Sequence, residues 1–195
     1  GGFNPLKGFL NQNDYQSVLD NMRLQDGSVW PMPITLDVHK EFSDSINISD
    51  KITLRDKEGF PLAILDVESI WVPNKDEEAQ KVFGTTDLKH PAVNYLMNEV
   101  RDVYVGGTLR GISLPKHYDY RHLRLTPNQQ KQIISENGWD KVVAFQTRNP
   151  MHRAHVEITK LAAENENAGL LIHPVVGMTK PGDVDHFTRV RCYQE

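Results

Sequence analysis

The sequence predicts a two-domain fold of the α/β class, in which a β-rich first domain is followed by an α/β domain with a parallel βαβ unit. Two patterns support this prediction. Residues 1–118 carry short strand-like runs separated by glycine and proline, which is typical of a small barrel or a mixed sheet. Residues 119–195 carry two apolar runs on either side of one amphipathic helical segment. We therefore expect the domain boundary at residue 118.

The strands of the first domain are predicted from alternating apolar residues. Residues 29–38 alternate in part and contain two prolines, so an edge or bulged strand is expected there. Residues 51–55 alternate cleanly, and residues 61–72 are long enough for one strand that continues through a bend. Residues 56–59, Asp-Lys-Glu-Gly, lie between these two runs and predict a hairpin turn.

Two short helices and a last pair of strands complete the first domain. Residues 76–83 and 91–98 are expected to be helical. Residues 103–105 and 108–112 are expected to form two strands, because the glycine pair between them can turn the chain.

The second domain is predicted from its helix signals and its apolar runs. Thr126, a proline at the next position and Gln129 make a capping-box arrangement, and the Asn-Gly pair at 137–138 ends that helix. The aromatic and basic residues 117–122 are interpreted as an interdomain connector with packed tyrosines. Ligands of parallel sheets bind beyond the carboxyl ends of the strands, so a site is expected at that edge. The expected elements are a helix at 127–137, a strand at 141–145, a helix at 150–165 and a strand at 170–176.

The composition narrows the class of protein. The 195 residues are 38% hydrophobic and 25% charged, which suits a folded chain with a buried core. A net charge of −4 disfavours a nucleic-acid partner. No apolar run approaches the ~20 residues that span a bilayer, so no membrane partner is expected. Cys192 is the only cysteine, which excludes an internal disulfide and favours a cytoplasmic protein. We expect Cys192 to be a small core residue.

Residues 146–155 are the most informative stretch, because they join an apolar strand to an amphipathic helix. Asn149 is a good N-cap, and the proline after it suits the first helical position. His152 and His155 are three residues apart and would share a helix face. Free backbone N–H groups, the positive helix end and Arg148 would then converge with both imidazoles. Such a place suits a phosphate or another oxyanion.

Three interpretations of His152 and His155 stay open at this point. They are two surface or capping histidines, a zinc pair, or phosphate-binding imidazoles. Zinc is disfavoured, because histidine ligands on one helix usually sit four apart and no acidic residue lies between these two. Arg148 favours a bidentate anion contact. Gln146 and Thr147 either shape the turn or face the same pocket.

The segment 177–189 is a second candidate, because it follows the second parallel strand and would reach the same sheet edge. It is otherwise a solvated connection. Asp183 and Asp185 could orient cations or hold a water of a magnesium ion, and Asp185 could instead cap a helix. The residues that could add positive charge are Lys180, His186 and Arg189.

The string at 146–155 resembles the signature of the ATP sulfurylase (sulfate adenylyltransferase) family, in its fungal and bacterial version. The match extends to residues 2–14 (GFNPLKGFLNQND), to 30–38 and to 105–107. It also includes residues 171–182 (LIHPVVGMTKPG). The resemblance therefore covers essentially the whole chain.

This resemblance implies a PUA-like N-terminal domain, followed by the first part of a Rossmann-like nucleotidyltransferase domain. The reaction it implies converts ATP and sulfate into adenosine 5′-phosphosulfate (APS) and pyrophosphate, the first step of sulfate assimilation. It also implies Mg²⁺ that enters with ATP, small-molecule substrates and a homo-oligomer. Gln146 and Arg148 would contact sulfate. The implied catalytic residues are Thr147, Arg148, Asn149, His152 and His155, and the same five with Gln146 would bind ATP.

One feature of the family is missing. Its second signature, GRDHAG, does not occur in these 195 residues. We therefore expect a fragment that has little or no activity by itself. The alternative functions are another adenylyltransferase with an H-x-x-H motif and a non-catalytic nucleotide-binding fragment.

Overall fold

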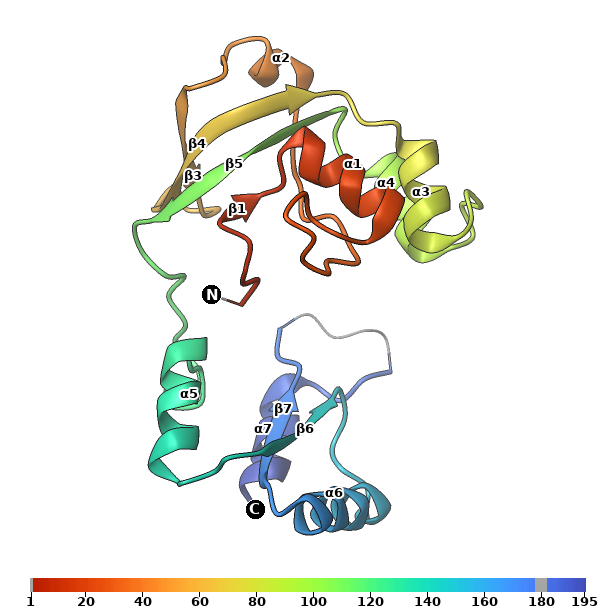
Figure 1. The fold of residues 1–195 in the computed structure, drawn as a ribbon. Coiled ribbons are helices and arrows are strands. Elements are labelled where there is room, and N and C mark those ends of the chain that lie inside the picture. Colours follow the sequence, from red (N-terminus) through yellow and green to blue (C-terminus); the bar gives the residue numbers. More distant parts are fainter. Residues whose placement is uncertain (1, 178–181) are drawn as a thin grey trace. The chain divides into compact units, whose positions relative to one another are not determined.

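The computed structural model describes residues 2–177 and 182–195, and it divides into two compact units, Phe3–Arg121 and His122–Glu195 (Figure 1). Each unit has its own sheet. Every helix in the described ranges is too short or too polar to cross a lipid bilayer.

The first unit is built on a five-stranded antiparallel sheet. The long strands β4 and β5 lie side by side at its centre (Figure 1). β3 continues the sheet beyond β4, while β1 and β2 both pair with β5. The strands are β1 (Gly8–Phe9), β2 (Leu36–Val38), β3 (Lys51–Arg55), β4 (Pro61–Trp71) and β5 (Val103–Gly111).

The hairpin predicted at residues 51–72 is confirmed. Its turn is closed by two bonds, from the Asp56 N–H to the Phe60 carbonyl at 3.0 Å and from the Gly59 N–H to the Asp56 carbonyl at 3.1 Å. Gly59 has a φ of +92°, which a residue with a side chain rarely adopts. The expected bend of β4 is also present, as a shift of register between Val67 and Ser69.

Two strand predictions differ from the structure. The edge strand expected at residues 29–38 is present as β2, which among the described strands pairs with β5 alone, but it is limited to the last three residues, because Pro31 and Pro33 have no N–H to donate to a ladder. The predicted pair at 103–112 is one continuous strand. A Cβ at Gly106 would lie 2.1 Å from the Leu10 carbonyl oxygen, and one at Gly107 would lie 2.0 Å from a carbonyl of β4. The glycines therefore permit close backbone packing and do not turn the chain.

Helices of the first unit include one that the sequence analysis did not predict. Helix α1 starts after Asn11, whose side chain accepts from the Asp14 N–H at 2.9 Å. It buries Tyr15, Val18 and Leu19, which have helical spacing. The helices predicted at 76–83 and 91–98 are confirmed as α3 and α4. The helices are α1 (Gln12–Asn21), α2 (Lys40–Ser43), α3 (Lys75–Phe83) and α4 (Pro91–Asn98).

A buried carboxylate joins α1, α3 and β5. Glu78 is 7% exposed and accepts from the hydroxyl of Tyr15 at 2.8 Å and from that of Tyr104 at 3.0 Å. The ring of Trp71 packs against both tyrosine rings, at 5.5 and 5.7 Å. Burial raises the pKa of Glu78, and it also raises the pKa of each tyrosine.

The second unit contains the predicted parallel βαβ arrangement. Strands β6 and β7 pair in parallel, and α6 connects them. The capping box of Thr126 and Gln129 at the start of α5 is confirmed. The elements are α5 (Pro127–Glu136), β6 (Val142–Thr147), α6 (Arg153–Glu166), β7 (Gly169–Pro174) and α7 (His186–Gln194).

Two smaller expectations are wrong. Tyr118 in the connector is 87% exposed, so it is not packed. Cys192 is exposed on α7 and is not a core residue, because the buried side chains at this end of the chain are those of Arg189 and Val190.

Candidate functional site

The carboxyl ends of β6 and β7 bring two distant segments together. Thr147 at the end of β6 pairs with Pro174 at the end of β7, so the residues that follow both strands emerge at one edge. A pocket of about 440 Å³ opens there. Its lining residues are Gln146, Thr147, Arg148, Asn149, Pro150, His155 and Val175. The site therefore forms where the parallel topology predicts it.

The turn after β6 is held by hydroxyl groups. The Thr147 hydroxyl lies 2.7 Å from the Asn149 carbonyl oxygen, and the Tyr193 hydroxyl lies 2.6 Å from the same oxygen. The Asn149 side-chain oxygen accepts from the Val184 N–H at 3.2 Å. The prediction that Asn149 is the N-cap of the helix, with the next proline at the first helical position, is therefore wrong. Its backbone and side-chain oxygens bind other groups.

His152 is the N-cap of α6. Its backbone is extended, and its Nδ1 accepts from the Ala154 N–H at 3.3 Å. Its carbonyl accepts from the N–H groups of His155 (2.8 Å) and Val156 (3.2 Å). The prediction of a free set of N–H groups at this helix end is wrong for these three amides. Because Nδ1 accepts, a neutral His152 carries its proton on Nε2, where it can be donated to an anion.

The two imidazoles lie next to each other, as the sequence predicts. The rings of His152 and His155 are 6.4 Å apart and nearly perpendicular. His155 also packs against Phe145 of β6 at 5.8 Å, which fixes its position over the strand. Of the two imidazoles, that of His155 lines the pocket and that of His152 does not. Because the two rings are neighbours, His152 lies beside the pocket.

Arg148 brings the main positive charge to the pocket. Its Nη2 lies 2.5 Å from a carboxylate oxygen of Asp183. The arginine side chain is 43% exposed and that of Asp183 is 14% exposed. A guanidinium has five N–H donors and this bond uses one of them, so Arg148 can bind an anion while Asp183 orients it.

The segment after β7 differs in part from its prediction. Asp183 reaches the same sheet edge as expected, but residues 186–189 are the first turn of α7 and not a loop. Asp185 is the N-cap of α7 and accepts from the Thr188 N–H at 3.0 Å, which lowers the pKa of its carboxyl. Lys180 lies outside the described residues.

Arg189 does not add charge to the pocket, contrary to the prediction. It is 1% exposed and donates to the Val175 carbonyl and, at 2.7 Å, to the Val184 carbonyl. It therefore ties the end of β7 to the start of α7.

The structure thus gathers Gln146, Thr147, Arg148, Asn149 and His155 around one pocket, with His152 at its side. Sequence analysis missed Tyr193, which carries no local signal because its partners lie in the turn after β6, 44 and 46 residues earlier. No group of three or more metal-ligating side chains occurs within the part of the chain that the structure describes. Asp183 is bonded to Arg148, and Asp185 caps α7.

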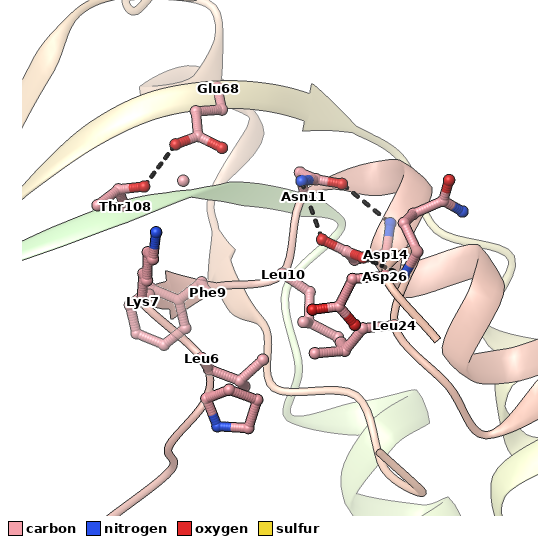
Figure 2. A pocket seen from close by; sticks show the side chains of 14 residues that line it. Leu6, Lys7, Phe9, Leu10, Asn11, Asp14, Leu24, Asp26, Glu68 and Thr108 are labelled. Carbon is pink, nitrogen blue, oxygen red and sulfur yellow. Dashed lines mark hydrogen bonds between the residues drawn. The ribbon is translucent and has the colours of Figure 1, made fainter. Parts of the chain in front are cut away.

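A second pocket, of about 290 Å³, lies in the first unit beside β1. Figure 2 shows two pairs of its polar side chains joined by hydrogen bonds. The Thr108 hydroxyl donates to Glu68 at 2.6 Å, and the Asn11 amide donates to Asp14 at 3.2 Å. Its other walls combine apolar residues such as Leu10 and Leu24 with the charged residues Lys7 and Asp26. Among the described residues that line it, the one cationic side chain, Lys7, is accompanied by the three carboxylates of Asp14, Asp26 and Glu68, so this pocket suits an anion less well than the pocket at β6.

Comparisons with known proteins identify the families that the two parts of the chain resemble. Residues 1–114 match a family described as "PUA-like domain", and residues 121–195 match one described as "ATP-sulfurylase". The sulfate adenylyltransferases of Saccharomyces cerevisiae and Kluyveromyces lactis are each 56% identical over 195 residues. That of Schizosaccharomyces pombe is 52% identical over 196 residues. Each covers 100% of this chain, which spans 38%, 39% and 40% of their respective lengths.

A solved structure described as "Hexameric APS kinase from Thiobacillus denitrificans" matches the whole chain with a TM-score of 0.76 and 30% identity. The match covers 34% of that chain.

Proposed function

The chain belongs to the sulfate adenylyltransferase (ATP-sulfurylase) family, and we propose that it forms the part of such an enzyme that binds ATP and sulfate. The reaction joins sulfate to the α-phosphorus of ATP, giving APS and releasing pyrophosphate. The chain spans about two fifths of the length of its curated relatives, so the proposal concerns the full-length protein that carries these residues. One observation carries it: within residues 121–195, which match the family, Gln146, Arg148 and His155 line one pocket.

The fold proposal follows from the same topology. We assign residues 1–118 to the PUA-like domain and residues 119–195 to the first part of a Rossmann-like nucleotidyltransferase domain. The parallel β6–α6–β7 arrangement supports the second assignment. The solved structure from Thiobacillus denitrificans that matches this chain is described as hexameric, which supports a homo-oligomer for this protein too.

Roles within the pocket follow from its charges. Sulfate is already ionised at neutral pH, so the reaction needs no general base. Two anions must approach each other, and the charge that develops on the departing pyrophosphate must be neutralised. Arg148 has N–H donors left for sulfate beside Asp183, and Gln146 at the strand end adds an amide. His152 and His155 would donate to the ATP phosphates.

The turn residues would complete the substrate contacts. Thr147 and Asn149 line the pocket, and their mutual hydrogen bond keeps the turn compact. Mg²⁺ would arrive bound to the ATP phosphates, because it commonly binds to substrate phosphates together with one or two carboxylates. A cytoplasmic location is part of the proposal, and it depends on the single cysteine.

The test is sulfate-dependent pyrophosphate release from MgATP by the full-length protein, with and without Arg148→Met. Removing a donor to a developing charge typically slows a reaction by about 10²–10³-fold, and we expect that loss. The matched control is Arg153→Met, because Arg153 is exposed on α6 and does not line the pocket. Molybdate should also stimulate ATP breakdown, since it resembles sulfate but gives an unstable anhydride. Equal rates for both variants would contradict the proposal.

A further inference from the structure

We propose that Tyr193 on α7 is a positioning residue for the turn that follows β6, and that its hydroxyl sets the geometry of the pocket. This inference rests on the proposed function for its kinetic consequence, although its structural part stands without it. Tyr193 is half-buried in the last turn of α7 and is absent from the residues that line the pocket.

Three oxygens meet between α7 and the turn. The Tyr193 hydroxyl lies 2.6 Å from the Asn149 carbonyl oxygen and 3.1 Å from the Thr147 hydroxyl oxygen, which itself lies 2.7 Å from that carbonyl. The carbonyl oxygen can only accept, and each hydroxyl has one proton; the Asn149 N–H, at 3.4 Å, donates to the Thr147 hydroxyl oxygen and not to the carbonyl. Tyr193 is therefore required as a donor, because Thr147 alone cannot supply both bonds.

The residues just before α7 hold the turn after β6 at two other points. The Val184 N–H donates to the Asn149 side chain at 3.2 Å, and Asp183 binds Arg148 at 2.5 Å. The buried Arg189 donates to the Val175 and Val184 carbonyls, which keeps this segment in place against β7. Tyr193, in the last turn of α7, donates to the backbone of the turn after β6.

The turn after β6 is therefore held in place by groups that do not line the pocket, such as Val184 and Tyr193. An ordinary helix start would use the Asn149 carbonyl as an acceptor within α6. Here that carbonyl faces the hydroxyl pair, and α6 begins only at Arg153. The stretch from Thr147 to His152 is thereby kept out of the helix. Its side chains Arg148 and Asn149 can then line the pocket. Small misplacements of such groups reduce rates about 10²-fold in enzymes.

The test compares Tyr193→Phe with wild type in the full-length protein. The phenylalanine keeps the ring packing and removes only the hydroxyl. We expect kcat for APS formation to fall about tenfold, while KM for ATP changes less than about twofold, because the groups remain but are less well aligned. The control is Tyr118→Phe, since Tyr118 is 87% exposed and should leave both constants unchanged.

A second measurement does not depend on the reaction. Amide hydrogen exchange in peptides covering residues 147–152 should be faster in Tyr193→Phe than in wild type, whereas exchange in β3 and β4 should be equal. Both proteins are compared at a temperature where circular dichroism shows them fully folded. Unchanged exchange and unchanged kcat would overturn the inference, and so would a lowered melting temperature with kcat unchanged. A wild-type protein without sulfate-dependent activity would refute the proposed function instead, leaving the exchange result to decide the role of Tyr193.

Discussion

His152 combines two roles that a pair of substitutions can separate. Its Nδ1 caps α6 through the Ala154 N–H, and its Nε2 faces away from that bond and is available to an anion. His152→Ala removes both groups. His152→Asn removes the imidazole but keeps a side chain that is among the best N-caps.

The size of the capping effect follows from the geometry. Loss of an N-cap costs about 0.5–2 kcal/mol. The bond of 3.3 Å is long for an N–H donor, so we expect the lower half of this range, about 0.5–1 kcal/mol. Amides in the first turns of α6 should then exchange about two- to fivefold faster in His152→Ala, while those in His152→Asn should match wild type.

The catalytic effect should not follow the capping effect. If Nε2 donates to the ATP phosphates, both substitutions should slow sulfate-dependent pyrophosphate release by about 10²-fold or more. The assay is run on the full-length protein beside native-state hydrogen exchange. An active His152→Asn variant beside an inactive His152→Ala variant would show that His152 is only a cap. Wild-type exchange in both variants would refute the capping bond itself.

Three further predictions concern the first unit. Tyr15→Phe should lower the free energy of unfolding by about 1–3 kcal/mol in urea denaturation, because it removes a donor from a buried carboxylate, while Tyr95→Phe, at a 62%-exposed position, should not. Burial raises the pKa of Glu78 in the folded state, so its contribution is complete below the ordinary pKa of about 4.3 and is lost as pH rises through the raised value. The stability of wild type relative to Glu78→Gln should therefore fall as pH rises above about 4.3, and a rise across a pH series of urea titrations would contradict this. Gly107→Ala should destabilise the sheet measurably in thermal melts, since its Cβ would lie 2.0 Å from a carbonyl oxygen of β4, and Gly111→Ala, in open space, is the control.

Local signals were sufficient for a large part of the fold. The capping box at Thr126 and Gln129, the hairpin around residues 56–59 and the helix at 91–98 each depend on contacts within a few residues. Helix α1 carried such a signal too, since Asn11 is followed three residues later by Asp14 and then by apolar residues at helical spacing. This signal is local, so helix α1 too is encoded by its own residues.

The errors at the site have a different origin. Asn149 and the proline after it are residue types preferred at the N-cap and at the first position of a helix. However, the Asn149 carbonyl accepts from Tyr193, which lies 44 residues further along the chain. Arg189 has a cationic side chain of the kind that binds phosphate, but it is buried and donates to two carbonyl groups. A capping or charge pattern cannot show which distant group will compete for the same atom.

The strand and helix periodicities, the parallel βαβ order and the stretch of the chain that reaches the pocket could all be predicted from the sequence. Each of these is encoded by neighbouring residues, whose hydrogen bonds and side-chain spacing act locally. Three features could be known only from the folded chain: His152 and not Asn149 caps α6, Asp183 binds Arg148, and Tyr193 binds the turn after β6. These features depend on which donors and acceptors meet in space. Each carbonyl oxygen accepts few hydrogen bonds and each hydroxyl donates one, so the closest well-aligned partner excludes the others.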